Sequence, residues 1–275
     1  MRDLFFKLFK DSHFDTGISI TAFSVSHIVY LVLIIGAIVG LYFLYRNEPY
    51  EKKRRLVSLI AILVLVSYIS DFFMHEFANA TETDGVFTGG GLNLDKLPFH
   101  ICTLLCPLSF LVQFNKRLSK FIEPVVILAV LAPMMYLFYP ANVGDGEPWC
   151  YTAVQTMFFH GALMAWGILN LALGIVKPEI KKCWHSAVLL AAITVWAKLG
   201  CLLYDHNWFF LNEDAFYIGL VEKGIIPQWL LMIINPVVFF LAALAVYGVV
   251  YAIRHFTEKK NVVSSAEKEL ETVCL

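Results

Sequence analysis

Residues 57–78 read Val57-Ser-Leu-Ile-Ala-Ile-Leu-Val-Leu-Val-Ser-Tyr-Ile-Ser-Asp-Phe-Phe-Met-His-Glu-Phe-Ala78, an apolar run whose last part carries acidic and imidazole side chains. The run is long enough to cross a bilayer as a helix, which takes about 20 mostly apolar residues. Six further runs of similar character lie at roughly 26–45, 97–114, 121–139, 151–176, 185–204 and 228–253. We therefore predict an all-α membrane protein, built as a seven-transmembrane-helix bundle.

The whole chain has the composition of a membrane protein. Of its 275 residues, 59% are hydrophobic and 16% are charged, whereas soluble domains are closer to half apolar and about a quarter charged. The net charge of -1 comes with no basic patch, so we expect no nucleic-acid partner. The six cysteines are scattered over apolar runs and loops and do not form a disulfide framework.

Positive charges alternate from one connecting loop to the next. The first, third and fifth loops and the C-terminal tail hold Arg46, Lys52, Lys53, Arg54, Arg55, Lys116, Arg117, Lys120, Lys177, Lys181, Lys182, Arg254, Lys259 and Lys260. The other loops hold only Lys96 and Lys223, among several acidic residues. Because cytoplasmic loops carry the excess of lysine and arginine, we predict the N-terminus outside and the C-terminus in the cytoplasm.

Three segments follow from these patterns. Residues 1–23 form an N-terminal interfacial amphipathic segment, in which 2–11 spread Leu and Phe along one face of a short helix. Residues 24–256 form the seven-helix transmembrane domain, and the glycine-rich stretch 84–91 is expected to be a flexible outer loop. The polar residues 257–275 are expected to be a disordered cytoplasmic tail.

Polar side chains converge in the outer half of the predicted bundle. This group comprises Asp71 and His75, one helical turn apart, together with His100, Thr103, Gln155, His160, Lys198 and Asn207. The inner half offers little besides Glu123. Two other interpretations stay open. In one, Asp71 and His75 face water at the membrane interface. In the other, Lys198 extends toward the lipid headgroups or pairs with a carboxylate.

Two histidines stand out because they lie within apolar segments. His100 lies in Leu97-Pro-Phe-His-Ile-Cys-Thr103, and His160 lies in Met157-Phe-Phe-His-Gly161. Ionisable groups at membrane depth are costly, so they indicate a functional site more often than an accident of sequence. Asp71, His75 and Glu76 with these two histidines have the side-chain types of a zinc site, but no diagnostic ligand spacing is present. We therefore expect neither a metal nor another cofactor.

Three short motifs resemble a known family. Leu97-Pro-Phe-His-Ile-Cys102 resembles the Leu-Pro-x-His-x-Cys signature of the YwaF-type bacterial integral membrane proteins, and Phe159-His-Gly161 fits the same family. The segment Leu203-Tyr-Asp-His-Asn-Trp-Phe-Phe-Leu-Asn212 is similar to the family's Asn-aromatic-x-x-Leu segment, so the resemblance covers roughly residues 55–250. This family is similar in turn to the animal transmembrane protein 164 group, described as acyltransferases that move fatty acyl chains onto lyso-ether phospholipids.

The resemblance implies a multi-pass protein of the cell membrane, here the bacterial plasma membrane, that performs acyl chemistry on lipids. His160 matches the proposed catalytic histidine of the animal group. The proposed nucleophilic cysteine of that group immediately precedes the histidine of the third span, and in this chain that position is Phe99.

Three routes for acyl transfer remain open on the sequence. Thr103 shares the face of His100, since at 100° per residue the two lie about 60° apart, whereas Cys102 lies about 160° away. Cys102 is the better nucleophile in kind, because a thiolate is more nucleophilic than an alkoxide. In the third route His160 acts as a general base on the acceptor hydroxyl and no covalent intermediate forms.

The favoured function is a membrane-embedded acyltransferase or transacylase, or a related lipid hydrolase, in which His160 is the base and His100 orients groups or stabilises charge. Asp71, His75, Gln155, Lys198 and Asn207 would help to bind the substrate. An outward-facing site favours a phospholipid as acyl donor and a lysophospholipid as acceptor, and the sequence identifies no protein partner. The alternatives are a lipid or small-solute transporter that uses the same polar residues, or a non-catalytic membrane binding protein.

Overall fold

The computed structural model describes residues 2–10, 20–92, 94–138, 147–211 and 220–273. Its α-helices are α1 (Arg2–Phe9), α2 (Val25–Tyr45), α3 (Tyr50–Ala78), α4 (Ile101–Phe114), α5 (Ile122–Phe138), α6 (Tyr151–Ala172), α7 (Trp184–Tyr204) and α8 (Leu231–Val273). Short 3-10 turns precede four of them, at η2 (Leu94–Lys96), η3 (Ser119–Phe121), η4 (Ile180–Lys182) and η5 (Gln228–Leu230). Strands β1 (Thr81–Thr83) and β2 (Val86–Thr88) form an antiparallel hairpin.

Six helical segments are long and apolar enough to cross a membrane. They are α2, α3, η2 with α4, η3 with α5, η4 with α7, and η5 with α8. The prediction of an all-α membrane protein is therefore confirmed. Helix α6 is not among these six, although it is 22 residues long; it carries the polar side chains Gln155, His160 and Asn170. All three of these side chains are buried inside the bundle.

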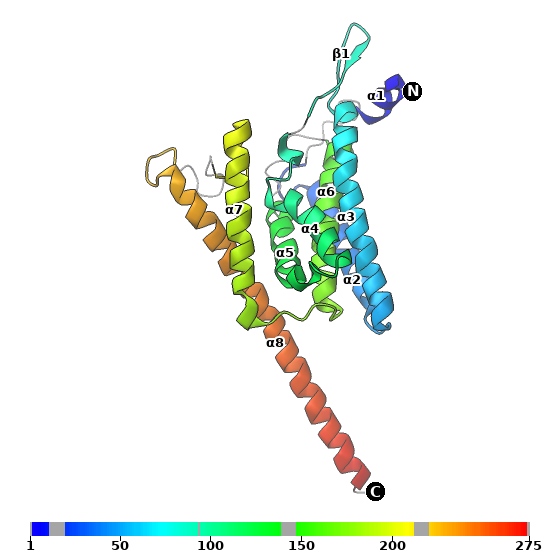
Figure 1. Ribbon diagram of the computed structural model, residues 1–275. Coiled ribbons are helices and arrows are strands. Elements are labelled where there is room, and N and C mark those ends of the chain that lie inside the picture. Colours follow the sequence, from blue (N-terminus) through cyan, green and yellow to red (C-terminus); the bar gives the residue numbers. More distant parts are fainter. Residues whose placement is uncertain (1, 11–19, 93, 139–146, 212–219, 274–275) are drawn as a thin grey trace.

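The centre of the bundle is formed by α5 and α6. Helix α6 packs against α5, α3 and α2, and α5 also packs against α4, α7 and α8 (Figure 1). A Cβ atom added to Gly167 of α6 would lie 2.9 Å from a methyl group of Val130 on α5, so only glycine permits this approach. Helix α2 lies at the periphery, and His27 and Ile38 are its buried residues. The rest of α2 is an apolar surface of the kind that a transmembrane helix exposes to lipid.

The two ends of the bundle differ. The β1–β2 hairpin and α1 lie at one end, called the hairpin end, and α8 extends beyond the other helices at the opposite end, called the tail end (Figure 1). Asp84 and Gly85 turn the hairpin with φ of 53° and 77°, values typical of a two-residue turn between paired strands. The predicted loop 84–91 thus contains β2. Phe6 of α1 is buried, and its ring stacks on Phe87 of β2.

Two boundaries differ from the sequence prediction. The third span was predicted to run over 97–114, but α4 begins at Ile101 and His100 is its N-terminal cap residue. Proline disfavours helical geometry in the residue before it, and Leu97 accordingly belongs to a turn closed by the hydrogen bond from the Phe99 N–H to the Leu97 carbonyl.

The tail predicted to be disordered over 257–275 is instead helical as far as Val273, because α8 continues through it. Segment 266–271, Ala-Glu-Lys-Glu-Leu-Glu, consists of strong helix formers. With 43 residues, α8 is about 65 Å long, roughly twice the thickness of a bilayer core, so its C-terminal part leaves the membrane.

Candidate functional site

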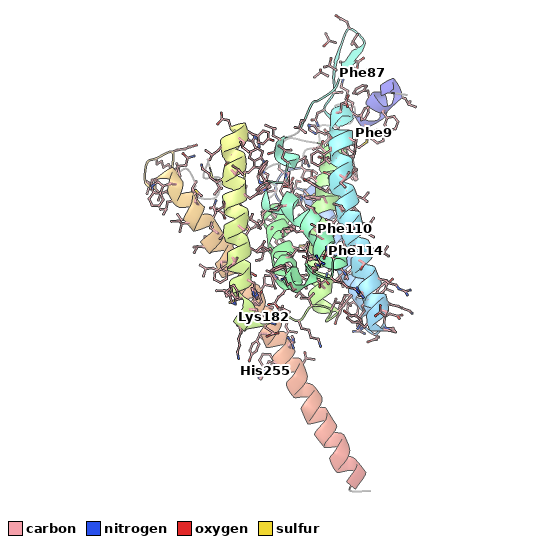
Figure 2. All side chains as sticks on the ribbon, in the orientation of Figure 1. Phe9, Phe87, Phe110, Phe114, Lys182 and His255 are labelled. Carbon is pink, nitrogen blue, oxygen red and sulfur yellow. The ribbon has the colours of Figure 1, made fainter. Side chains whose placement is uncertain are left out.

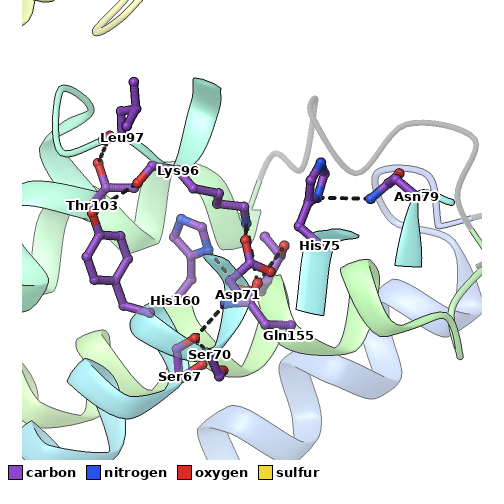
Figure 3. A network of polar contacts seen from close by, with 12 residues as sticks. Ser67, Ser70, Asp71, His75, Asn79, Lys96, Leu97, Thr103, Gln155 and His160 are labelled. Carbon is purple, nitrogen blue, oxygen red and sulfur yellow. Dashed lines mark hydrogen bonds and ion pairs between the residues drawn. The ribbon is translucent and has the colours of Figure 1, made fainter. Parts of the chain in front are cut away.

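An ion pair within the bundle is the starting point of the site. The Asp71 carboxyl group on α3 is 2% exposed, and its Oδ2 lies 3.3 Å from the Lys96 ammonium at the end of η2 (Figure 3). The same ammonium donates to Oε1 of Gln155 on α6 over 3.3 Å. The turn that carries Lys96 is fixed by the Tyr68 hydroxyl, which donates to the Lys96 carbonyl over 2.9 Å. The Lys96 ammonium thus connects three segments that are far apart in sequence, namely α3, η2 and α6.

Gln155 ties this ion pair to two helices. Its Nε2 donates to the Ser67 carbonyl over 3.2 Å, while its Oε1 accepts from Lys96. A buried amide must be satisfied on both sides, and these bonds meet that requirement with a donor and an acceptor from different elements. Asp71, Lys96, Gln155 and the neighbouring His160 are called the polar cluster below.

His160 lies one turn and a half beyond Gln155 along α6 and is also buried. Its Nδ1 lies 2.8 Å from the Thr156 carbonyl, and its ring stacks on that of Tyr136 of α5, with centroids 3.9 Å apart. A carbonyl only accepts, so Nδ1 carries the proton and Nε2 presents a lone pair. Lys96 and His100 are close enough to act on His160 electrostatically. The geometry thus presents an imidazole base next to an ammonium group.

His27 provides a contrast within the same protein. It is fully buried on α2, yet its Nε2 bonds to the Leu137 carbonyl at 2.6 Å and its Nδ1 accepts from the Phe23 N–H at 2.9 Å. Both nitrogens of His27 are therefore used to hold the fold. Over the residues that the structure describes, His160 makes such a bond through Nδ1 alone. Of these two buried histidines, His160 is the one with a ring nitrogen available for chemistry.

A second group of imidazoles lies at the rim of the hairpin end. Oδ1 of Asp95 lies 2.7 Å from Nε2 of His206 and 3.7 Å from Nε2 of His100. The other ring nitrogen of His100 accepts from the Phe209 N–H over 3.4 Å. His100 therefore links the start of α4 to the loop after α7, and its ring is not inside a helix as the sequence suggested.

The loop after α7 is conformationally strained. Asp205, Phe209 and Phe210 have φ values of 51°, 55° and 54°, in the left-handed region that bulky residues avoid. The Asn235 amide of α8 holds the loop by donating to the carbonyls of Phe209 and Phe210, over 2.9 and 3.2 Å. Strain of this kind persists only where surroundings fix it, and it concentrates at functional sites. The last residue of the corresponding sequence motif, Asn212, lies outside the described residues.

The structure separates the candidates of the third span. The Thr103 hydroxyl is within donating distance of the Leu97 and His100 carbonyls, at 2.9 and 3.0 Å, so it closes the turn before α4. Cys102 is buried in the apolar core. Phe99 stacks on Trp196 and packs against Trp208, with centroids 5.2 and 4.8 Å away, so its ring points toward α7 and the strained loop.

The other predicted binding residues lie on α3, on α7 and in the strained loop. His75 turns to Asn79, where its Nδ1 lies 2.9 Å from the amide nitrogen (Figure 3). Lys198 lies partly exposed on α7, and Asn207 lies in the strained loop. Among the described residues, no group of three or more His, Cys, Asp and Glu side chains is placed to hold a metal ion.

Sequence reasoning missed several residues. Lys96 and Asp95 were assigned to a loop, and Tyr136 was an unremarked aromatic residue in an apolar run. The one available signal was that Lys96 is almost alone as a positive charge among the acidic loops. The expectation that the other half holds little besides Glu123 was wrong, because Gln113 accepts there from the Trp166 indole over 3.3 Å and donates to the Ser58 hydroxyl over 3.1 Å.

Comparison with known proteins places the chain in a family. The model of the TMEM164 family matches residues 22–251, which is most of the chain, so the protein belongs to the TMEM164 family. The match includes all of the polar cluster and the strained loop. Comparison with curated proteins and with solved structures gave no match.

Proposed function

We propose that the protein is a membrane-embedded acyltransferase or transacylase acting on phospholipids, with His160 as its general base. The observation that carries the proposal is the state of His160, whose Nδ1 bonds to the Thr156 carbonyl while Nε2 is left with a lone pair. A base must present its lone pair in a fixed orientation before the substrate arrives, and the Thr156 carbonyl fixes both the ring orientation and the tautomer. Membership of the TMEM164 family supports a lipid-facing role.

The proposed reaction is direct transfer between two lipids. The hydroxyl oxygen of a lysophospholipid attacks the ester carbonyl of a donor phospholipid while Nε2 of His160 takes the hydroxyl proton. Collapse of the tetrahedral intermediate breaks the donor's ester C–O bond, and the imidazolium returns the proton to the departing alkoxide. The products are one diacyl lipid and one new lysophospholipid, so no co-reactant is required.

Lys96 is the proposed stabiliser of the charge that develops on the carbonyl oxygen. An ammonium group has three N–H donors, of which two face Asp71 and Gln155. The third is proposed to donate to the oxyanion. Fixed donors inside a low-dielectric site contribute strongly to catalysis because they need no reorganisation. Asp71 would then hold the ammonium in place, as a positioning residue.

A covalent intermediate on the third span is disfavoured by the surroundings of its candidates. The hydroxyl of Thr103 is engaged with two carbonyls, and the Cys102 thiol is packed in the core. A buried thiol in apolar surroundings is inert, because the reactive thiolate form is disfavoured there. The route without a covalent intermediate is therefore the one proposed here.

We also propose that α6 is a seventh span and that the hairpin end faces outward. The 22 residues of α6 extend about 33 Å, enough to cross a bilayer core. The N-terminal segment and the end of α8 lie at opposite ends of the bundle, as an odd number of crossings requires (Figure 1). Lysine and arginine of the first, third and fifth loops then lie on the cytoplasmic side.

Transport is the less favoured function because the two polar regions are separated. Between the polar cluster and the polar contacts of Gln113 lie Val64, Leu105 and Leu163, all completely buried in the apolar core. A solute path requires a continuous polar or wet lining across the bundle. These three side chains interrupt it.

The test is a labelling experiment on membranes. Wild-type protein and His160→Ala are supplied with an isotope-labelled lysophospholipid, and lipids are analysed by mass spectrometry. We expect label in diacyl lipid with the wild type and a rate roughly 10²–10⁴-fold lower with His160→Ala, the range of general-base contributions. A matched control is His185→Ala, which removes an imidazole from the tail end of α7.

The control separates loss of chemistry from loss of protein. His185→Ala should label diacyl lipid at the wild-type rate, and both variants should elute from size exclusion as the wild type does. Full labelling by folded His160→Ala would refute the enzymatic proposal. Dependence of labelling on acyl-CoA added at the cytoplasmic face would refute the phospholipid as donor.

A further inference from the structure

A groove at the tail end of α3 and α4 lies far from the polar cluster. It has a volume of about 430 Å³ and is lined by Glu51, Arg54, Arg55, Ser58, Leu59, Ile62, Gln113 and Phe114. Phe114 lies at the end of α4 and packs against Phe110, with ring centroids 4.7 Å apart (Figure 2). The volume is in the range of small-molecule sites. None of these residues takes part in the proposed acyl transfer.

The groove has two chemically distinct walls. Leu59, Ile62 and Phe114 are 60%, 38% and 47% exposed, and they form an apolar wall on the surface of a membrane-spanning segment. The cationic wall is formed by Arg54 and Arg55, which precede Leu59 along α3. An apolar wall that meets a cationic one at the end of a span matches a lipid, whose acyl chain and phosphate are joined in that order.

The cationic wall is available for an anion. Within the ranges that the structure describes, neither Arg54 nor Arg55 forms an ion pair or a hydrogen bond with another side chain. Lys52 of the same turn, by contrast, pairs with Glu48 at 2.8 Å. Guanidinium groups bind phosphate oxygens through paired N–H donors, so two of them on one wall favour a phosphodiester.

The floor of the groove is polar and preorganised. The Gln113 amide donates to the Ser58 oxygen over 3.1 Å, and its own oxygen accepts from the buried Trp166 indole. One of the two lone pairs of the Ser58 hydroxyl is thereby occupied, and its O–H remains a donor at the groove. A hydroxyl held in this way adds a neutral donor beside the two guanidinium groups.

Glu51 narrows the class of lipid. Its carboxylate lines the same groove, so the lining holds two positive charges and one negative charge. A headgroup with only negative charge would be repelled by Glu51, whereas an ammonium beside the phosphate would be attracted. We propose that this groove binds an amine-bearing glycerophospholipid, with its phosphate on Arg54 and Arg55, its ammonium near Glu51 and an acyl chain along Leu59, Ile62 and Phe114.

Native mass spectrometry of the full-length protein in detergent tests the proposal. Phosphatidylethanolamine, phosphatidylglycerol or inorganic phosphate is added, and bound adducts are counted for each. We expect the wild type to retain phosphatidylethanolamine best and to retain phosphate alone not at all. Arg54→Gln with Arg55→Gln should lower lipid retention on the order of tenfold, given the contribution of each basic residue to lipid binding.

Matched charge controls decide whether the groove is responsible. Lys52→Gln with Lys53→Gln removes the same charge from the same turn without touching the lining, and it should change retention less than twofold. Equal losses in the two double variants would overturn the site in favour of diffuse attraction. Tight retention of inorganic phosphate alone would overturn the lipid assignment.

Glu51→Gln provides the second, independent readout. It should bring retention of phosphatidylglycerol up to that of phosphatidylethanolamine while total binding persists, because only the headgroup preference depends on the carboxylate. An unchanged preference would overturn the assignment of the ammonium to Glu51. The altered side chains are exposed, apart from the partly exposed Lys53, so melting temperatures in detergent should match the wild type.

Discussion

The two polar regions of the bundle lie in opposite halves of the same helices and are built from different chemistry. The polar cluster near the hairpin end holds a buried carboxylate, an ammonium and an imidazole. The region near the tail end, here called the amide cluster, consists of Ser58, Gln113, Trp166 and Asn170 and holds no charge.

The difference shows what each region is suited to do. The amide cluster joins α3, α4 and α6 by neutral hydrogen bonds, which tie helices together at little electrostatic cost. A buried ion pair adds little net stability, because the cost of desolvation offsets most of the attraction between the charges. An ion pair beside a histidine with one ring nitrogen available is therefore better explained by a role in catalysis than by a contribution to stability. Four experiments can break or sharpen this comparison.

The largest effect is expected from removing one member of the ion pair. Asp71→Ala removes the buried carboxylate from the Lys96 ammonium, whose side chain is only 15% exposed, and losing one partner of a buried pair costs about 3–5 kcal/mol. We expect the free energy of unfolding to fall by about 3 kcal/mol in detergent micelles, measured by denaturant titration. The double variant Asp71→Ala with Lys96→Met should regain much of this stability. If it is instead as unstable as the two single losses added together, the ion pair is not the cause.

Breaking the amide cluster should cost less and leave chemistry alone. Trp166→Phe removes the indole N–H that donates to Gln113 and leaves an unsatisfied oxygen, at a cost of about 1–3 kcal/mol. The same denaturant titration measures the loss, and lipid labelling per folded molecule should equal that of the wild type. A loss of labelling without a loss of stability would mean that the two clusters do not have separate roles.

A third experiment asks whether the half with the polar cluster also contains a thiol nucleophile. Cys102→Ala removes one buried sulfur from the core and should lower stability by about 1 kcal/mol, with lipid labelling retained. The prediction follows from the buried position of the thiol. Labelling that disappears while the protein stays folded would restore Cys102 as the nucleophile.

The smallest effect concerns the turn before α4. Thr103→Val keeps the side-chain shape but removes the donor to the Leu97 and His100 carbonyls, which should cost about 0.5–1.5 kcal/mol. Thr194→Val is a matched control, because the Thr194 hydroxyl donates to the Leu190 carbonyl within α7. We expect a smaller loss there, since that carbonyl lies inside a regular helix. Equal losses would mean that Thr103 does not hold the turn that positions Lys96.

The sequence predicted the general fold well because apolar run length is a local property. Runs such as 57–78 exceed the thickness of a bilayer, and this run lies within a helix that begins seven residues earlier, at Tyr50, and ends at Ala78 as predicted. The start of α4 was misplaced because the turn that contains Pro98 is held by Thr103 and by contacts with α7, such as the bond from the Trp196 indole to the Pro98 carbonyl. Those contacts are not visible in a run of residues.

The candidate site was only half visible in the sequence. Asp71, Gln155 and His160 could be found because polar residues in apolar runs are costly and therefore conspicuous. Lys96, Asp95 and Tyr136 could not, since charged residues in loops and aromatic residues in spans are ordinary. The sequence indicated that His75 can contact Asp71, one helical turn away, and the structure adds a contact to Asn79, whose amide nitrogen lies 2.9 Å from Nδ1 of His75.

By itself, the sequence determined that this chain is a helical membrane protein with costly polar groups in several of its apolar runs. Hydropathy and charge act locally, so they can be read without knowledge of the packing. Only the tertiary structure decided which groups meet. It brought Lys96 to Asp71 and set the tautomer of His160 through Thr156. It also placed His75 beside Asn79 and Phe99 against Trp196. Those outcomes depend on how helices distant in sequence rotate and pack, which no single segment specifies.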